Sequence, residues 1–188
     1  MITSKQDYLK YVAEDQKANG AFHIPFIKRL FFYSEHYSIL QYLKLLRKME
    51  YRTNVTNKGL IGKILYTIAN YRYMKLGHKL GILIPVNVTG YGLKMHHIGG
   101  IILNAGIKIG NNCTIQTGVI IGQTQRGHLP EVGDDVYFAP GSQAFGKIKI
   151  GNNVVVAPNS VVVKDVPDNC VVSGVPAKII RRNGEKVG

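Results

Sequence analysis

A six-residue repeat between Ile109 and Val166 constrains the fold of this chain more than any other feature of its sequence. When the stretch is divided into sixes around a short break, GHLPE, nearly every unit opens with an aliphatic or aromatic side chain. These openers are Ile109, Ile115, Ile121, Val132, Phe138, Ala144, Ile150, Val156 and Val162. The second position is mostly Gly or Ala, and the fifth is small or β-branched. A period of six fits neither an amphipathic helix nor an alternating strand, so the repeat predicts a stacked solenoid.

Each hexad predicts a short strand followed by a corner. The opening side chain points into the coil and stacks on its counterpart in the next turn, while Gly-Asn-Asn or Ala-Pro-Asn suits a tight corner. Three hexads make one triangular turn, so the run from Ile109 accounts for about three turns. Residues 85–92 resemble an imperfect first coil, as expected of a terminal repeat.

The first 80 residues predict helices instead. A helix over 3–18 is capped by Thr3 or Ser4, a second helical segment starts at Pro25 and continues past Ile39, and a third runs from Leu60 to about Leu80. The third carries an apolar stripe of Ile61, Ile64, Leu65, Ile68, Tyr71 and Leu76. We therefore divide the chain into a helical subdomain over 1–81, a β-helix over 82–168, and a carboxyl-terminal cap and tail over 169–188, where Pro167 and Pro176 should block further strand pairing.

Composition narrows the class of partner. The net charge is +13, and the first 80 residues hold 14 Lys or Arg against 5 acidic residues. No nucleic-acid recognition motif accompanies this charge, so we expect no nucleic acid and favour a polyanionic small molecule. Association with a membrane surface stays open but is not the expectation. A polar start and the absence of an apolar run of ~18 residues favour a cytoplasmic protein. Cys113 and Cys170 form no CxxC pattern, which predicts neither a disulfide framework nor a zinc knuckle.

Three stretches carry a resemblance to a known family. The hexads, the segment GLKMHHIGGIIL around His97 and the closing SGVPAKII resemble the hexapeptide-repeat acyltransferases, and among them the serine O-acetyltransferases and their relatives in polysaccharide gene clusters. The resemblance spans roughly Leu83 to Arg182. It implies a mainly β fold, a left-handed parallel β-helix with an amino-terminal helical subdomain. It also implies an O-acetyltransferase that uses acetyl-CoA, and a homotrimer with its site between subunits; the short helical region favours a single trimer over a hexamer.

His97 is the candidate catalytic residue. Acyl transfer to a hydroxyl needs a base that works near neutral pH, which imidazole supplies. By the resemblance, His97 takes the proton of an acceptor hydroxyl that attacks the thioester, with no acyl-enzyme and no metal. The plainer alternative is that His97 only occupies a coil corner. A zinc site of His96, His97 and His128 is disfavoured, because adjacent rings do not readily converge on one ion.

The acceptor side departs from the serine acetyltransferases. The residue before the histidine is His96 instead of Asp, the orienting Asp aligns with Ile82, and an Arg-His-Pro run becomes His128-Leu129-Pro130. A main-chain carbonyl or Glu131 is then left to support the base. We expect His96, His128 and Glu131 to contact the acceptor, which is serine or a hydroxyl of a capsular or lipopolysaccharide sugar. A non-catalytic scaffold is the remaining alternative.

For the donor, the resemblance assigns small residues on one edge of the coil to the acetyl-CoA groove. They are Gly122, Gly141, Ser142 and Ser160. Glycine lets a ligand approach the backbone closely. Lys178 in the closing GVPAK is expected near the 3′-phosphate, for which a lysine is a suitable point charge.

Overall fold

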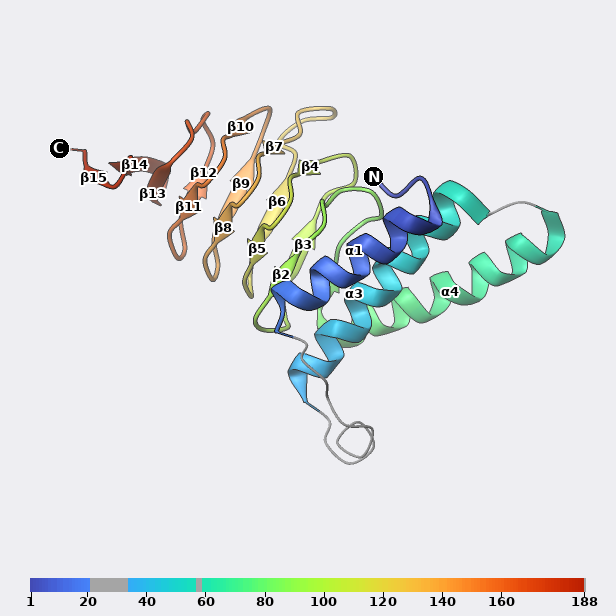
Figure 1. The fold of residues 1–188 in the computed structure, drawn as a ribbon. Helices are drawn as coiled ribbons and strands as arrows, with labels where there is room; N and C mark the ends of the chain where they lie inside the picture. The colour runs from blue at the N-terminus through green and yellow to red at the C-terminus, as the bar shows by residue number, and fades with distance from the viewer. Residues whose placement is uncertain (21–33, 57–58, 188) are drawn as a thin grey trace.

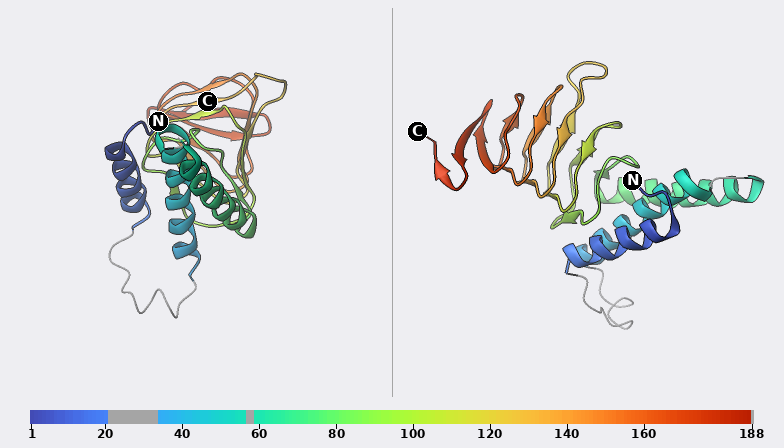
Figure 2. Two further views of the ribbon diagram at one scale, coloured as in Figure 1. Left: turned by 90° about the vertical axis from the view of Figure 1, so that its right-hand side faces the viewer. Right: turned by 45° about the horizontal axis from the view of Figure 1, so that its top comes forward.

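The computed structural model describes residues 1–20, 34–56 and 59–187. It is a parallel β-solenoid of about five turns with a helical region at its amino-terminal end (Figure 1). The chain starts among the helices and leaves at the opposite end of the solenoid (Figure 2). This arrangement confirms the predicted fold class, a solenoid with a helical amino-terminal part.

The helices begin where capping residues predict. They are α1 (Lys5–Ala18), α3 (Glu35–Tyr51), the π-helical turn η1 (Arg52–Thr56) and α4 (Gly59–Leu80). The Ser4 hydroxyl caps α1 by accepting from Asp7 N–H at 3.0 Å, and Ser34 caps α3 by accepting from Tyr37 N–H at 3.1 Å. The helix start predicted at Pro25 lies outside the described residues.

The solenoid wall has three sheets, one for each side of the prism. The first contains β1 (Ile82–Leu83), β3 (Ile101–Leu103), β6 (Ile120–Gly122), β9 (Gln143–Phe145) and β12 (Val161–Val162). The second contains β4 (Lys108–Ile109), β7 (Glu131–Val132) and β10 (Lys149–Ile150). The third contains β2 (Lys94–Met95), β5 (Thr114–Ile115), β8 (Tyr137–Phe138), β11 (Val155–Val156), β13 (Cys170–Gly174), β14 (Ala177–Arg182) and β15 (Glu185–Lys186).

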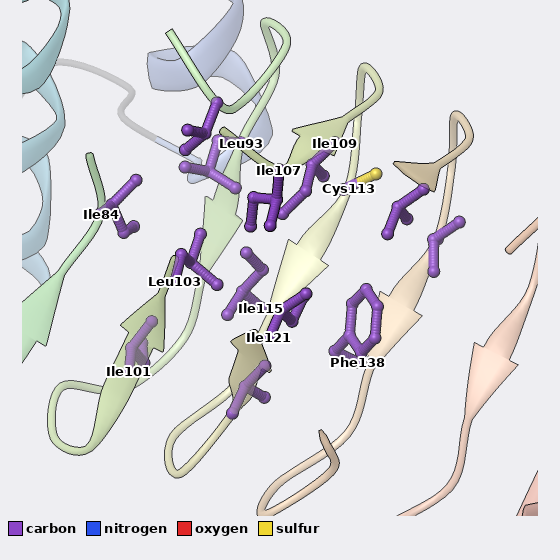
Figure 3. Packing of buried hydrophobic residues seen from close by; sticks show 14 of the residues in the cluster. Ile84, Leu93, Ile101, Leu103, Ile107, Ile109, Cys113, Ile115, Ile121 and Phe138 are labelled. Atoms are coloured by element: carbon purple, nitrogen blue, oxygen red, sulfur yellow. The ribbon is translucent and has the colours of Figure 1, made fainter. Parts of the chain in front are cut away.

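The positions of the hexad that the sequence predicts to point inward are the positions that form the core. All nine opening residues are buried, and so are the described fifth-position residues of regular hexads, such as Cys113, Val136 and Val154 (Figure 3). Strands pair in parallel from turn to turn, for example Ile115 with Phe138. The prediction that the openers point inward is confirmed. The hexads from Ile109 are only the later turns, because Ile82 already pairs with Ile101 and Thr89 bridges to Ile109.

The carboxyl-terminal prediction was wrong in one respect. Pro167 and Pro176 do not stop strand pairing: β13 pairs in parallel with β11, then turns back into antiparallel β14, which pairs with β15. The hairpin ends the parallel stack by reversing direction, and its turn contains Pro176, where no ladder amide is needed.

Helix α4 presents a different face from the one its apolar stripe predicts. Ala69, Tyr73, Gly77 and Leu80 are buried, whereas Leu60, Ile61, Ile64, Leu65, Ile68 and Tyr71 are exposed. The buried face contains Gly77, which has no side chain and so lets the helix approach β1 closely. A Cβ at Gly77 would lie only 2.7 Å from the carbonyl oxygen of Ile82. The close approach of α4 to β1 therefore leaves most of the apolar stripe exposed, and only Leu76 at its end packs against the core.

Side chains from the helices complete the backbone hydrogen bonding of the first turn of the solenoid. That turn has no strand beneath it, so its amides need other partners. Polar side chains of α1, its C-cap Asn19 and α3 accept from these amides: Asp15 from Leu93 N–H at 2.9 Å, Asn19 from Met95 N–H at 3.0 Å, Tyr42 from Ile84 N–H at 3.2 Å, Glu50 from Asn87 N–H at 2.9 Å and Glu35 from Ile98 N–H at 2.7 Å. The helical region is thus a polar cap on the solenoid.

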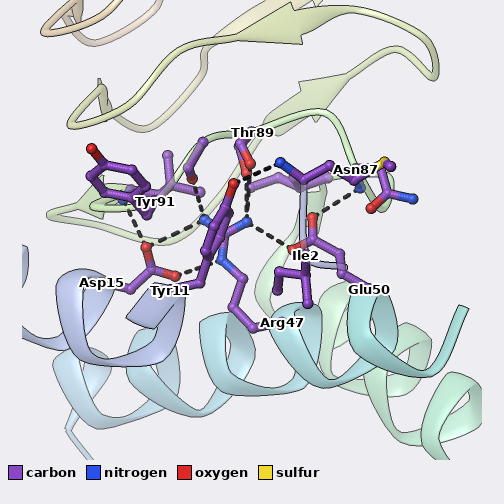
Figure 4. A network of polar contacts seen from close by, with 12 residues as sticks. Ile2, Tyr11, Asp15, Arg47, Glu50, Asn87, Thr89 and Tyr91 are labelled. Atoms are coloured by element: carbon purple, nitrogen blue, oxygen red, sulfur yellow. Dashed lines mark hydrogen bonds and ion pairs between the residues drawn. The ribbon is translucent and has the colours of Figure 1, made fainter. Parts of the chain in front are cut away.

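Arg47 lies at the centre of this cap (Figure 4). Its side chain is fully buried, with Nε 2.7 Å from Asp15 and Nη1 3.0 Å from Glu50. It also donates to the carbonyl oxygen of Thr89 at 3.1 Å and to that of Gly90. Burial alone would lower the pKa of Arg47, but the two carboxylates outweigh burial and raise it, so the guanidinium stays charged.

Candidate functional site

His97 lies where the chain turns from β2 to β3, at one edge of the prism. We call this edge, with the corners stacked on it in later turns, the His97 edge; it comprises residues 96–100, 116–119, 139–142 and 157–160. Backbone hydrogen bonds join the corners: Gly118 N–H to Gly99 O at 3.0 Å, Gly141 N–H to Thr117 O at 2.9 Å, and Asn159 N–H to Pro140 O at 3.0 Å. The corners are therefore in register from turn to turn.

Glycines keep the backbone of this edge close-packed. Gly100, Gly118 and Gly141 all have positive φ, which other residues rarely adopt. A Cβ on Gly100 would lie 3.3 Å from Gly118 Cα, and one on Gly118 would lie 3.3 Å from Gly141 Cα. The edge consequently has accessible main chain at these glycines, beside the exposed side chains of Pro140, Pro158 and Asn159, and a narrow extended ligand can lie along it.

The imidazole of His97 is held from the helical region. Its Nδ1 atom lies 3.3 Å from Glu35 Oε2, and the other oxygen of Glu35 accepts from Ile98 N–H at 2.7 Å. The His97 side chain is nevertheless 63% exposed, so the rest of the ring faces solvent. The hydrogen bond from Ile98, followed by the contact with His97, lowers the pKa of Glu35, which is ionised at neutral pH.

Sequence reasoning missed Glu35. It begins α3, far from His97 in the chain, and no local pattern links the two. The only signal was its place after a capping Ser34, which predicts a helix start and not a site residue. Within one chain Glu131 lies away from His97, on β7, with its Oε1 3.3 Å from Lys108 Nζ, so its support of the base stays a prediction.

The predicted acceptor residues do not gather around His97 in one chain. His96 is adjacent and exposed, and partial burial, then Lys94 and His97, lowers its pKa. His128 lies in the exposed loop between β6 and β7, which stands out from another edge of the prism (Figure 2). Glu131 follows it, on the sheet that does not border the His97 edge.

Of the predicted donor residues, Gly141 belongs to the His97 edge with its backbone accessible. Ser142 and Ser160 also belong to it, but their side chains are fully buried. The Ser160 hydroxyl accepts from Gly174 N–H at 3.0 Å, and the Ser142 hydroxyl has no hydrogen-bond partner among the described residues. As fifth-position residues these two side chains point into the coil, so any contact they make with a ligand would come from their main chain.

Lys178 stands at the far end of the His97 edge. Gly174 is bonded to Ser160 in the last corner, and the exposed Lys178 pairs with Ser173 just beyond it. From β2 to β14, which carries Lys178, there are five strand-to-strand steps, or roughly 24 Å at about 4.8 Å each. A cation is thus separated from the imidazole by the length of the glycine-lined edge.

Gly122 lies elsewhere, at the end of β6. It lines a shallow groove of about 490 Å³ together with Ile102 and Phe145. The outward residues of this first sheet are mainly apolar, with Leu83, Ile102 and the adjoining Val163 exposed. In contrast, the outward residues of the second sheet are Lys108, Glu131 and Lys149.

Within residues 1–20, 34–56 and 59–187, no group of three or more His, Cys, Asp and Glu side chains is placed to hold a metal ion. Among the helices of the same residues, none combines the length and apolar character needed to cross a membrane.

Comparison with known proteins relates the chain to one group of enzymes. It is 39% identical over 107 residues to the serine acetyltransferase of Staphylococcus aureus strain Mu50, and 38% identical over the same length to that of Staphylococcus epidermidis strain RP62A. Each match covers 55% of this chain and 50% of the relative, so the chain spans about half the length of the curated relatives it matches. No protein-family model matches the sequence.

Solved structures extend the likeness to the helices. Serine acetyltransferase of Neisseria gonorrhoeae is 26% identical with a TM-score of 0.70, covering 97% of this chain and 69% of that one. Its complex with serine gives a TM-score of 0.66 at 26% identity, covering 95% and 71%. The coenzyme A complex from Brucella abortus, at 23% identity, shares the fold with a TM-score of 0.70, covering 97% and 70%. The predicted resemblance to the serine acetyltransferases is confirmed.

Proposed function

We propose that this chain, a β-solenoid relative of the serine acetyltransferases, transfers the acetyl group of acetyl-CoA to a hydroxyl oxygen, with His97 as general base. The observation that carries the proposal is the His97 edge itself. An exposed imidazole stands at one end, accessible main chain follows, and a lysine stands at the other end. The relatives include structures determined with serine and with coenzyme A.

The chemistry needs one proton to move twice. His97 takes the proton of the acceptor hydroxyl through its free ring nitrogen as the oxygen attacks the thioester carbonyl carbon. Collapse of the tetrahedral intermediate breaks the C–S bond, and the departing sulfur receives the proton from the imidazolium. The products are an acetyl ester and coenzyme A, so no acyl-enzyme is needed.

The donor fits the edge by shape and by charge. The pantetheine arm is narrow and can lie against the close-packed corners at Gly118 and Gly141. Lys178 lies five strands, or about 24 Å, away along the strand stack, where it can neutralise a phosphate. The net charge of +13 favours approach of a polyanion to the protein.

For the acceptor we propose serine, with a sugar hydroxyl as the second candidate. Serine is supported by the names of the relatives and by the complex with serine. The sugar is supported by the surroundings of His97: the preceding residue is His96, and the carboxylate of Glu35 already binds Ile98 N–H and the imidazole. An amino acid acceptor carries an ammonium group that favours a carboxylate partner, whereas a neutral sugar does not.

The working unit we propose is a homotrimer in the cytoplasm, with each site shared by two subunits. In one chain, His97 and His128 belong to different edges of the prism, so contact of both with one acceptor requires two copies. The first sheet and α4 expose large apolar side chains, which a second copy would cover.

Coenzyme A release tests the function. Purified protein is incubated with acetyl-CoA and either serine or a panel of sugars, and free thiol is measured over time. We expect turnover with one acceptor class, loss of at least 10²-fold in His97→Ala, and normal rates in His78→Ala, which removes another exposed histidine. Turnover that survives in His97→Ala would refute the assignment of the base, and no turnover with any acceptor would favour a scaffold.

A further inference from the structure

The contact between α3 and the His97 edge is made by both oxygens of one carboxylate. Glu35 is the first residue of α3, and its Oε1 accepts from Ile98 N–H at 2.7 Å. Because that bond is to the main chain next to His97, it fixes the carboxylate relative to the corner. The second oxygen, Oε2, is then presented to His97 Nδ1 at 3.3 Å.

We infer that Glu35 is the positioning residue of the base: it selects the Nδ1–H tautomer of His97 and leaves Nε2 free to accept the hydroxyl proton. This inference rests on the proposed function. An ionised carboxylate only accepts hydrogen bonds, so the nitrogen facing it must carry the proton. The ring is 63% exposed and would otherwise rotate and exchange tautomers, which lowers the fraction of base ready to react.

No other carboxylate is placed to do this among the described residues. The residue that aligns with the family's orienting Asp is Ile82, which is apolar and buried. Glu131 lies on another sheet and pairs with Lys108. The carboxylate that contacts the histidine therefore comes from the helical region instead of the coil, and α3 is part of the site.

The contact between Glu35 and His97 should orient the imidazole and add little to the stability of the fold. Glu35 is 40% exposed and His97 63% exposed, so water screens the pair and the ion-pair energy is small. A buried triad that loses its carboxylate falls about 10⁴-fold in kcat. For an exposed pair we expect a smaller loss, about 10²-fold.

A purely structural role is the competing explanation, because Glu35 is also one of the side chains that cap the first turn. Tyr42 supplies the matched control: its hydroxyl accepts from Ile84 N–H at 3.2 Å in the same cap, but it does not contact His97. Tyr42→Phe therefore breaks a cap hydrogen bond and leaves the imidazole alone.

Steady-state kinetics of Glu35→Gln separate these roles. The amide oxygen of Gln can still accept from Ile98 N–H, while its NH₂ group faces Nδ1 and favours the wrong tautomer. We expect kcat to fall about 10²-fold with KM changed less than threefold, partial recovery in Glu35→Asp, and near-normal kcat in Tyr42→Phe. An unchanged kcat, an effect on KM alone, or an equal loss in Tyr42→Phe would overturn the inference.

A second measurement does not depend on turnover. In protein with ¹⁵N-labelled histidine, the chemical shifts of the His97 ring nitrogens report the tautomer; His97→Ala assigns the signals. We expect the Nδ1–H form in the wild type and a mixture or the Nε2–H form in Glu35→Gln. A wild-type ring without the Nδ1–H preference would refute the role of Glu35 even if His97 proved to be the base. Conversely, a clear preference in a protein without activity would leave the positioning intact and refute the function.

Discussion

Replacing Arg47 by Met should be among the most damaging single changes in the helical cap. Met matches much of the aliphatic stem but removes the guanidinium that contacts Asp15 and Glu50 at 2.7 and 3.0 Å. Both carboxylates are at least 97% buried and would lose their only ion-pair partner among the described residues. The carbonyl oxygens of Thr89 and Gly90 would also lose a donor.

The expected loss in the free energy of unfolding follows from these lost contacts. Removing one partner of a buried ion pair typically costs about 3–5 kcal/mol. Asp15 and Glu50 would each keep one hydrogen bond from a main-chain amide, to Leu93 and Asn87 respectively, which holds the estimate near the middle of that range. We expect Arg47→Met to lower the free energy of unfolding by about 4 kcal/mol at pH 8, a large share of the 5–15 kcal/mol typical of a folded domain.

The loss should also depend on pH. Burial raises the pKa of Asp15 even beside Arg47, and without the guanidinium only main-chain hydrogen bonds, such as that from Leu93, oppose that effect. A carboxyl whose folded pKa lies above its unfolded value keeps its proton longer in the folded state, so folding gains stability as pH falls. The deficit of Arg47→Met relative to wild type should therefore shrink between pH 8 and pH 5.

Urea unfolding followed by helical circular dichroism at 222 nm, at one fixed protein concentration, measures these differences. The control is the triple variant Asp15→Asn, Arg47→Met, Glu50→Gln, which removes all three charges and keeps acceptors for the two amides. It should recover most of the lost stability. A deficit below about 1.5 kcal/mol, or one equal at both pH values, would show that Arg47 does not neutralise buried charge.

Two changes on the His97 edge should have opposite effects on stability. Ser142→Ala removes a buried hydroxyl that has no partner among the described residues, so the thermal midpoint should rise, by the equivalent of about 1 kcal/mol; a fall would mean that an unseen partner satisfies the hydroxyl. Gly141→Ala places a Cβ over Asn159 Oδ1 at positive φ and should cost more than about 1 kcal/mol. Gly127→Ala is its control, since it has the same strain with no atom within 4 Å, and equal losses in the two would exclude the overlap as a cause.

The solenoid was predictable because its signal repeats. The inward-facing position recurs in every turn, so each repeat gives independent support for the same assignment. The nine opening residues could therefore be assigned to the core from sequence alone. The same register would have placed Ser142 and Ser160 inside the coil, since both occupy the buried fifth position; the resemblance led us to assign them to the ligand instead.

What sequence reasoning could not supply were contacts between the two parts of the chain. Glu35 reaches His97 only because α3 docks against the first turn, and no periodicity encodes that docking. The outward face of α4 has the same origin: its apolar stripe is clear, but the approach at Gly77 decides which side is buried. One-dimensional patterns report local burial, whereas these contacts depend on how separate units fit together.

The polar cap has a consequence for assembly. A parallel solenoid has unpaired backbone N–H and C=O groups at each end of its stack of coils. Another chain can add to such an unpaired edge. At the amino-terminal end, side chains such as Asp15 and Asn19 accept from the amides of Leu93 and Met95, which are then not available to a further coil. At the far end, the reversed hairpin extends the third sheet with antiparallel strands. Both features disfavour the joining of copies end to end, and so favour association through the sides of the prism.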